Sequence, residues 1–571
     1  MGAAWPRVPG ALHALVPVVI LGLWALAIRS VDLDGMTDIG LVSVLPPTAI
    51  LLLFVLTASF AVSLAGPLRT WAIVAHVAVL IVMLYGITAF IEPVPRFETV
   101  WKHVGIIDYI ARHGSVDPSI DAYFNWPGFF VLGAIITKTA GFASPLAFAA
   151  WGPLAFNLLF LPPLLVLFRA ATDDPRLVWL SVWVFYAANW VGQDYIAPQA
   201  VAFLLWLSMA AVLVTWFLPR TRIAASGARA PSPVQRAGLL LVVIAMFAAI
   251  TTGHQLTPFA VILCVTGLVL FAGLGTRGLP WLMAVMLAAW IGYMTIAYLA
   301  GNIESLTKPL GSLGSNIDQN VSNRLEGSAE HAAIGHIRIY ATAAIWVLAI
   351  AGLARRRLAG RSDTALMVIG AAPFLLLVLQ PYGGEMLLRV FLFSLPAVAF
   401  FTAGLVFPSP LTVARRWSFA GAAVVGCLLL GVFQFTRYGN ERLESFTKGD
   451  VAAVHALYRL APPGAALYAG SYNLPWRYRD YAGYDYHVIA DGDAWRRDSN
   501  DSAAVIREIQ QTSGPKGAYV IMTRSTKIGA ELFTSRPGAV ERLVSRLRSS
   551  RAARELYHAP GSEIFFVRRR T

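Results

Sequence analysis

Charged residues are scarce in this sequence. Asp, Glu, Lys and Arg make up 13% of its 571 residues, whereas hydrophobic residues make up 57%, and the mean hydropathy is +0.63. This composition excludes an ordinary soluble globular protein and predicts a polytopic α-helical membrane protein. The formal net charge of +14 does not indicate a nucleic-acid partner. The arginines cluster in short loops between apolar segments, as membrane orientation requires.

Cysteine is also scarce. The two cysteines, Cys264 and Cys427, both fall inside apolar segments, which excludes a disulfide framework and a cysteine-ligated metal cluster. His331 and His336 have no carboxylate at the spacing of a recognisable metal site, so we expect no essential zinc. We expect no cofactor, and a divalent cation stays open as an alternative.

Long apolar runs are abundant, and a run of about 20 residues is long enough to cross the hydrocarbon core of a bilayer. The segment 127–142 is apolar too, but counting it as a crossing would place most basic loops outside the cell. The positive-inside rule therefore predicts an amphipathic or re-entrant helix there, at the outer membrane surface. We predict about thirteen crossings, near residues 11–28, 48–65, 71–91, 148–168, 177–189, 201–218, 238–252, 257–273, 279–299, 339–354, 365–380, 390–407 and 418–435.

The first apolar run has two interpretations. Ala25-Leu26-Ala27 fits a signal-peptidase site, but the run is long for a signal peptide and a second span returns soon after it. A retained transmembrane hairpin at residues 1–70 is therefore favoured. It precedes a main transmembrane domain at residues 71–436 and an extracytoplasmic domain at residues 437–571.

The predicted crossings assign a side to each loop. They describe a multi-pass protein of the plasma membrane whose C-terminal domain is extracytoplasmic. The cytoplasmic loops are short and mostly basic, and they contain no glycine-rich phosphate loop, which argues against nucleotide chemistry on that side. Any chemistry is therefore expected on the outer face, in the loops at residues 92–123, 192–199, 253–258, 301–338 and 381–389.

The sequence becomes polar from about residue 449. Helical segments alternate with strand-like runs at residues 466–468, 518–522 and 563–567, which predicts a small α/β domain. Its aromatic belt fits stacking platforms for sugar rings, a surface on lipid headgroups or a packing face over the membrane domain. The belt consists of Tyr472, Trp476, Tyr478, Tyr481, Tyr484 and Tyr486.

The first outer loop contains motifs in a recognisable order. Phe97-Glu98-Thr99 and Trp101-Lys102-His103 come first, followed by a helix-like segment at residues 104–114 and then by Tyr123-Phe124-Asn125-Trp126-Pro127-Gly128. A late span opens with Arg389, an aromatic run and Pro396. In order and spacing the chain resembles the GT-C glycosyltransferases, polytopic enzymes that take a sugar from a polyprenyl-phosphate carrier at the outer membrane face. The resemblance covers roughly residue 71 to the C-terminus.

The resemblance implies a carboxylate that takes the proton of the acceptor hydroxyl during inverting transfer. Many family members carry adjacent Asp and Glu where this chain has Trp101-Lys102. The candidate catalytic residues are therefore Glu98, Asp108 and Asp121, and Glu98 is favoured. Asp108 alternatively caps or solvates a helix face, and Asp121 alternatively starts the turn into the aromatic-proline motif.

The phosphate of such a donor needs a fixed cation near the membrane surface, and a guanidinium suits it because it stays charged and offers a planar fork. Arg389 is our candidate, and the alternative is an interfacial arginine paired with Glu385. Polar groups between apolar spans must find partners or line a wet cavity. The predicted substrate-binding residues are His103, Trp126, Asp194, Gln199, His254, Glu385 and Arg389.

The long loop at residues 302–336 carries many charges without strong periodicity. It is either a lid that orders on substrate binding or a mobile surface loop.

The sequence as a whole predicts an integral membrane glycosyltransferase. Its partners are a polyprenyl-phosphate-linked sugar donor, the lipid bilayer, and a glycan, lipid or protein acceptor of the cell envelope. One alternative is a transporter, flippase or assembly scaffold, which usually carries ionisable groups near mid-membrane. Another is a polymerase or ligase of a different membrane fold. Two juxtamembrane helices between consecutive spans would argue against this second alternative.

Overall fold

The structure is a computed structural model that describes residues 10–219, 230–296, 298, 327–378, 385–408, 416–532 and 538–569. Most of the predicted lid, residues 302–326, lies outside these ranges.

A helix occupies each of the thirteen predicted crossings. Seven of them, among the described residues, are long and apolar enough to span a membrane, and the chain is a multi-pass membrane protein. The helices are α1 (Gly10–Ala27), α2 (Pro47–Ala65), α3 (Thr70–Tyr85), α8 (Gly152–Ala171), α9 (Pro175–Ala188), α10 (Pro198–Trp216), α12 (Pro233–Gly253), α13 (Thr257–Phe271), α14 (Leu279–Trp290), α17 (Ala329–Leu358), α18 (Thr364–Ala371), α19 (Met386–Gly404) and α20 (Arg416–Tyr438).

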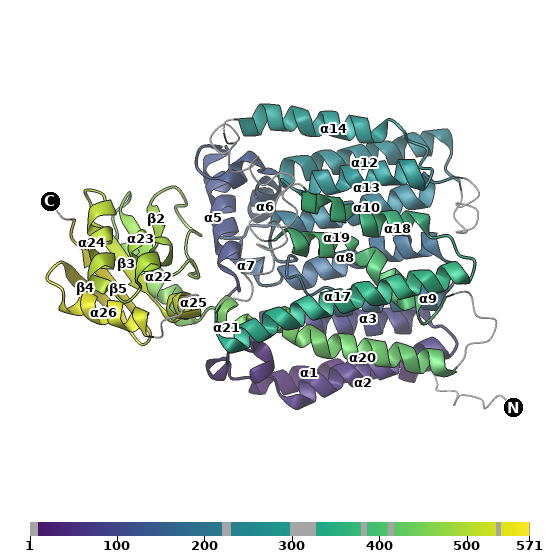
Figure 1. Cartoon of the computed structure of the whole chain (residues 1–571), viewed down its shortest axis with the longest axis horizontal. Helices are drawn as coiled ribbons and strands as arrows, with labels where there is room; N and C mark the ends of the chain where they lie inside the picture. The colour runs from purple at the N-terminus through teal and green to yellow at the C-terminus, as the bar shows by residue number, and fades with distance from the viewer. Residues whose placement is uncertain are drawn as a thin grey trace.

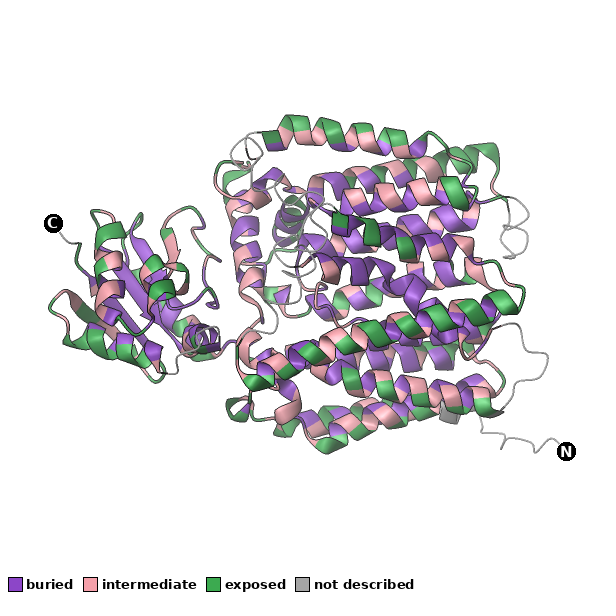
Figure 2. Cartoon of the chain, viewed as in Figure 1, coloured by how far each residue is buried: buried purple, intermediate pink, exposed green. Residues whose placement is uncertain are grey.

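Three of these helices continue in short segments. Helix α3 is followed by α4 (Ile87–Ile91), α14 by the π-helical turn η5 (Ile291–Thr295), and α18 by the 3-10 turn η6 (Ala372–Val378). Helices α9 and α19 are buried along almost their whole length, at the centre of the bundle (Figure 2).

Two helices that do not belong to the parallel bundle separate α4 from α8. Helix α5 (Glu98–His113) lies across one end of the bundle (Figure 1). It ends where Gly114 adopts a φ of 68°, a left-handed conformation that glycine adopts without steric cost. Helix α6 (Gly128–Thr139) begins directly after the aromatic-proline motif, where the surface helix was predicted. The short segments η4 (Ala122–Asn125) and α7 (Leu146–Ala149) complete this connection.

Residues 441–569, which we call the sheet domain, form an α/β unit beside the same end of the bundle (Figure 1). Its five-stranded sheet has the order β2-β1-β3-β5-β4. Strands β1, β2 and β3 are parallel, whereas β5 is antiparallel to β3 and to β4. The strands are β1 (Ala466–Ala469), β2 (Asp485–Val488), β3 (Ala518–Met522), β4 (Ala553–Ala559) and β5 (Ser562–Val567), and the helices are α21 (Glu441–Glu444), α22 (Lys448–Leu460), α23 (Asp493–Arg497), α24 (Ser502–Thr512), α25 (Arg524–Leu532) and α26 (Ala539–Ser549).

Three apolar cores hold these parts together. The first fills the helix bundle. The second joins one face of the sheet to α5 and α6, and it includes Trp101, Phe130, Leu467 and Trp476. The third covers the other face of the sheet, under α24 and α26. Because the second core is shared, the sheet domain is packed directly on α5.

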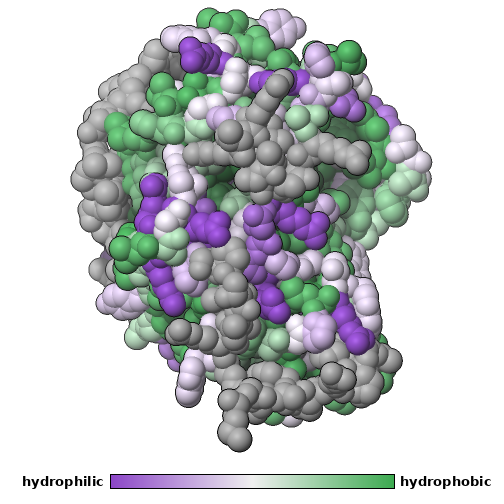
Figure 3. Space-filling view, turned by 90° about the vertical axis from the view of Figure 1, so that its right-hand side faces the viewer, coloured by the Kyte–Doolittle hydropathy of each residue, from purple (hydrophilic) through white to green (hydrophobic). Residues whose placement is uncertain are grey.

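The opposite end of the bundle faces the viewer in Figure 3, where hydrophilic residues gather among hydrophobic ones. Helix α17 ends there with three arginines in its last turn, residues 355–357. Arg356 is buried and forms a bidentate pair with Asp363. Its Nε and Nη2 each donate to one carboxylate oxygen of Asp363 at 2.8 Å. These basic loops are the ones that the positive-inside rule assigns to the cytoplasm, and that assignment stays a prediction.

Candidate functional site

A cavity of about 490 Å³ lies between the bundle and the sheet domain. We call it the junction cavity. Its wall is formed by the start of α5, by α17, by the start of α19 and by residues of the sheet domain and of the segment that leads into it. The polar side chains on this wall are Glu98, Thr99, His331, Arg338, Thr342, Glu385, Asn440, Glu444, Tyr472 and Asn473.

Glu98 is the first residue of α5, and the residue before it holds an unusual backbone conformation. Phe97 has a φ of 65°, which is strained for a bulky side chain and persists only where the surroundings enforce it. Here the Phe97 amide donates to the Glu444 carbonyl at 2.9 Å. The Arg96 guanidinium also lies over the Phe97 ring, 4.2 Å from its centroid. These contacts fix the direction in which α5 begins and therefore the position of Glu98 on the cavity wall.

The environment of Glu98 suits a proton acceptor. Burial raises the pKa of its carboxyl group, while Lys102 and Arg477 act in the opposite direction. Its side chain forms a hydrogen bond with Thr99 and no ion pair with any described residue. A carboxylate with a raised pKa that faces a cavity is well placed to take a proton from a bound hydroxyl group.

The other two candidate catalytic residues lie away from the cavity wall. Asp108 pairs with Arg112 on the same helix at 2.5 Å. The Asp121 carboxylate lies 3.0 Å from Lys102 Nζ and accepts from the Tyr481 hydroxyl at 2.9 Å. Although burial opposes it, the lysine and these hydrogen bonds lower the pKa of Asp121. Asp121 also caps the turn η4, which is the structural alternative that its sequence context predicts.

Asp194 belongs to a buried polar cluster instead of the cavity wall. Its Oδ1 lies 2.8 Å from Arg437 Nη2, and its Oδ2 accepts from Asn157 at 2.5 Å. Asn189 in turn donates to Asn157 at 3.3 Å. Of the two expected environments for polar residues between apolar spans, Asp194 therefore has the one in which these residues form hydrogen bonds and ion pairs with one another.

Arg389 lies behind the cavity wall. It is buried, and its Nη2 lies 2.8 Å from the Glu385 carboxylate, which is partly exposed and lines the cavity. The predicted alternative, a pair between these two residues, is therefore present. A phosphate role for Arg389 stays a prediction, because Arg389 itself does not line the cavity.

His254, Gln199 and His103 are grouped near Arg389. His254 Nδ1 accepts from the backbone amide of Thr257 at 3.1 Å, and Gln199 lies 3.5 Å from the Thr257 hydroxyl. Burial, with the positive charge of Arg389, lowers the pKa of His254 to about 3. His254 is therefore neutral at physiological pH and acts here as a hydrogen-bond acceptor.

His103 is packed among aromatic rings and is also neutral. Its Nδ1 donates to the Ile196 carbonyl at 2.8 Å, and burial lowers its pKa to about 4. Trp126 packs edge-to-face against Tyr298, 6.2 Å between ring centroids. Neither His103 nor Trp126 lines the junction cavity.

The sequence prediction missed Arg338. It lines the cavity from α17, and its Nε donates to the Thr436 carbonyl at 2.7 Å. Its guanidinium also lies 5.7 Å from the Trp190 ring centroid. A signal for it exists in the sequence, because an arginine at the outer start of a span is an exception to the positive-inside pattern.

A cluster of four charged residues adjoins the cavity. Arg96 Nη2 lies 2.6 Å from Glu441, and it also pairs with Glu444. Burial raises the pKa of Glu92 to about 7 and raises that of Glu441 well above its ordinary value. One arginine thus faces three carboxylates, and its positive charge lowers the pKa of Glu92 and Glu441 against the larger effect of burial. Among the described residues, no three His, Cys, Asp or Glu side chains form a group that could hold a metal ion.

Comparisons with known proteins give little similarity. No family model and no curated protein matches the sequence. Among solved structures, the chain is similar to ArnT from Cupriavidus metallidurans in the apo state, with 11% identity and a TM-score of 0.41, over 83% of this chain and 94% of that chain. It is also similar to the same protein bound to undecaprenyl phosphate, with 12% identity and a TM-score of 0.44, over 86% and 97% of the two chains. The function therefore has to be inferred from the residues of the chain itself.

Proposed function

We propose that the protein is a membrane glycosyltransferase of the GT-C type, which transfers a sugar with inversion from a polyprenyl-phosphate donor to an acceptor of the cell envelope. The observation that carries this proposal is the position of Glu98. It stands at the start of the first of two helices that lie between consecutive spans, and it faces a cavity that also presents Arg338 and Glu385. The reaction takes place on the extracytoplasmic face, where we place the sheet domain.

Each wall of the cavity has chemistry that suits one part of the reaction. Glu98 takes the proton of the acceptor hydroxyl while its oxygen bonds to the anomeric carbon, and the bond from that carbon to the phosphate oxygen breaks with its electron pair. The phosphate leaves as an anion. Arg338 on the wall and Arg389 behind Glu385 supply the positive charge that stabilises it.

The wall of the cavity toward the bundle suits the lipid part of the donor. Leu387, Leu388 and Phe391 of α19 and Trp346 of α17 line it, so the apolar chain of a lipid-linked donor would meet apolar side chains there. The buried ion pairs among the described residues, such as Asp194 with Arg437 and Arg356 with Asp363, lie at helix ends. A transporter would be expected to carry such groups near mid-membrane, so this placement favours the enzyme.

The test is a transfer assay with purified protein, a panel of polyprenyl-phosphate sugars and an envelope glycan fraction as acceptor. We expect Glu98→Gln to lower turnover about 10²- to 10⁴-fold, the usual contribution of a general base. Asp108→Asn is the matched control, because its carboxylate lies on the same helix away from the cavity. Full activity of Glu98→Gln would exclude Glu98 as the base.

The phosphate role is tested separately by donor affinity. Arg338→Met and Arg389→Met should each weaken binding of a polyprenyl phosphate, measured by displacement of a fluorescent analogue. An unchanged affinity in either variant would remove that arginine from the donor site.

A further inference from the structure

The parallel part of the sheet has a topological switch point. Strand β1 lies between β2 and β3, and all three run in the same direction. The segment that follows β1 packs in the core on the α5 face of the sheet, through Trp476 and Tyr478. The segment that follows β3 packs on the opposite face, through Ala530. In open α/β sheets, ligands bind outside the carboxyl ends of strands where the connections diverge in this way.

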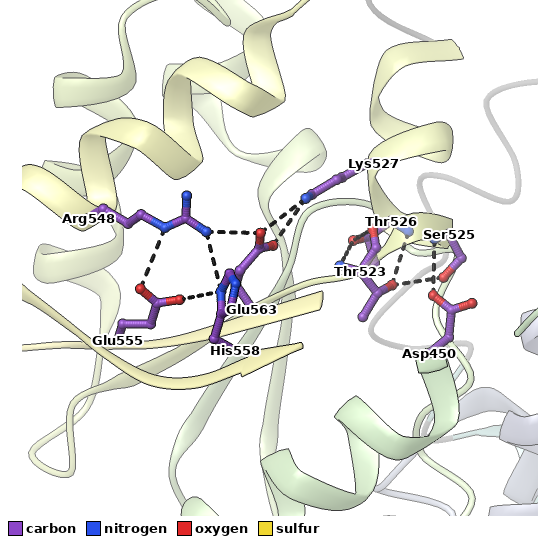
Figure 4. A network of polar contacts seen from close by, with 9 residues as sticks. All are labelled: Asp450, Thr523, Ser525, Thr526, Lys527, Arg548, Glu555, His558 and Glu563. Atoms are coloured by element: carbon purple, nitrogen blue, oxygen red, sulfur yellow. Dashed lines mark hydrogen bonds and ion pairs between the residues drawn. The ribbon is translucent and has the colours of Figure 1, made fainter. Parts of the chain in front are cut away.

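The carboxyl end of β1 lies at the junction cavity. Tyr472 and Asn473, which follow the carboxyl end of β1, both line it. The loop after β3 is held in place beside them, since the Ser525 amide donates to Asp450 Oδ1 at 3.1 Å and Thr523 contacts Ser525 through their hydroxyls at 3.0 Å (Figure 4). Asn473 Nδ2 lies 3.4 Å from the Ser525 carbonyl and thus connects the two loops.

The orientation of the sheet domain is set by its contact with α5. A Cβ atom on Gly105 would lie 1.8 Å from the Arg477 carbonyl oxygen, so the two backbones approach as closely as glycine allows. Trp101 and Tyr478 pack edge-to-face at 5.3 Å, and Tyr481 donates to Asp121. The switch point is therefore held against the cavity by the same helix that begins with Glu98.

Tyr472 differs from the buried members of the aromatic belt. Trp476, Tyr478 and Tyr481 are 1%, 8% and 6% exposed, because they form the packing face over α5, whereas Tyr472 is 50% exposed. Partial burial and the carboxylates of Glu444 and Glu98 raise the pKa of Tyr472 to about 12. An aromatic ring beside an amide and several carboxylates suits a neutral, hydroxyl-rich ring, which stacks on the aromatic face and donates hydrogen bonds to the oxygens.

We propose that the switch point of the sheet domain is the acceptor subsite of the junction cavity, and that it takes a neutral glycan whose terminal sugar stacks on Tyr472 in front of Glu98. This inference rests on the proposed function and narrows its acceptor from a glycan, lipid or protein to a neutral glycan. Anionic glycans are disfavoured beside Tyr472, because the carboxylates of Glu444 and Glu98 act on this residue, whereas the phosphate of the donor is proposed to lie toward Arg338 on the α17 wall.

The test measures glycan binding directly, with the full-length protein in detergent micelles. The probes are soluble di- to hexasaccharides of neutral hexoses and pentoses, with uronic-acid oligosaccharides as the anionic set. We expect at least one neutral probe to bind and Tyr472→Ala to weaken it about tenfold or more. Tyr472→Phe, which keeps the ring, should bind as the wild type does. Tyr484→Ala removes a ring of the same belt away from the cavity and should leave the affinity unchanged.

The outcomes separate this inference from the proposed function. Failure of every neutral probe to bind the wild type, or wild-type affinity in Tyr472→Ala, would overturn the acceptor subsite. Transfer that requires Glu98 but shows an unchanged acceptor KM in Tyr472→Ala would overturn the subsite and leave the transferase in place. Glycan binding that depends on Tyr472, without transfer from any donor, would support the subsite and contradict the transferase.

Discussion

Two carboxylates at the same end of the bundle, Asp194 and Glu98, lie in opposite surroundings. Asp194 is 3% exposed and uses both oxygens, one toward Arg437 and one toward Asn157. Glu98 is half-buried, lines a cavity and forms no ion pair among the described residues. In both places the polar group interrupts apolar packing. The difference is that Asp194 is neutralised by the chain itself, whereas Glu98 is available to a bound molecule.

Under the proposed function, Asp194 is a structural polar group and Glu98 is a catalytic one. A buried ion pair whose hydrogen bonds are satisfied is costly to break, because removal of one partner leaves the other charged and desolvated. A half-buried carboxylate on a cavity wall contributes little to stability and is free to exchange a proton. Replacement of the carboxylate by an amide should therefore lower the stability of the protein at Asp194. At Glu98 the same replacement should lower turnover and leave stability unchanged.

The largest effect on stability is expected from Asp194→Asn. The variant leaves the charge of Arg437 buried without its counterion, and we expect about 3 to 5 kcal/mol of destabilisation, seen as a large drop in melting temperature in detergent. Asp108→Asn is the control, since its partner Arg112 is 44% exposed and the loss of such a pair costs at most about 1 kcal/mol. Equal melting temperatures in the two variants would remove the structural role of Asp194.

A second, smaller effect is expected where the sheet domain meets α5. Gly105→Ala places a methyl group against the Arg477 carbonyl, and such overpacking costs about 1 to 3 kcal/mol. The sheet domain should then become easier to cleave from the bundle in limited proteolysis, and the cavity should lose its Tyr472 wall. Gly22→Ala is the matched control, because no atom lies within 4 Å of the Cβ position there. Wild-type protease resistance in Gly105→Ala would contradict the docking of the two parts.

The smallest effect on stability is expected at a third carboxylate, Glu92, which belongs to the charged cluster beside the cavity. Burial raises its pKa to about 7, so the folded protein holds this proton more tightly than the unfolded chain, whose glutamates have a pKa of about 4.3. Stability should therefore fall as the pH rises from about 5 to about 8.

Glu92→Gln tests this pH dependence. The variant should match the wild type at pH 5 and melt a few degrees higher at pH 8, as followed by thermal unfolding across that range. Glu330→Gln, which changes an exposed glutamate in the first turn of α17, is the control and should keep the pH dependence of the wild type. A parallel fall in the melting temperatures of Glu92→Gln and the wild type would assign the pH dependence to other groups.

Most of the fold could be predicted from the sequence, because the signals are local. Helices lie at all thirteen predicted crossings, α5 ends at the predicted Gly114, and β1, β3 and β5 occur where strand-like runs were found. Strands β2 and β4 were missed. Both are partly exposed along much of their length, so they lack the apolar run that identifies a buried strand.

The site could be predicted only in part, because it depends on contacts between distant segments. Glu98 was selected through its place in an ordered set of motifs; it lines the junction cavity, and its catalytic role stays a prediction. The partner of Asp194 is 243 residues away in the chain, and no local pattern links the two. Arg338 and Tyr472 likewise come to line the same cavity as Glu98 only after α17 and the sheet domain have packed beside α5.

The most direct test of the account compares Glu98→Gln and Asp194→Asn in the same preparation, with sugar transfer and thermal unfolding measured on each. We predict that Glu98→Gln loses at least about a hundredfold in turnover while its melting temperature stays at the wild-type value. Asp194→Asn should instead lose melting temperature. Full turnover in Glu98→Gln, or a loss of stability equal to that of Asp194→Asn, would contradict the assignment of Glu98 as the functional carboxylate.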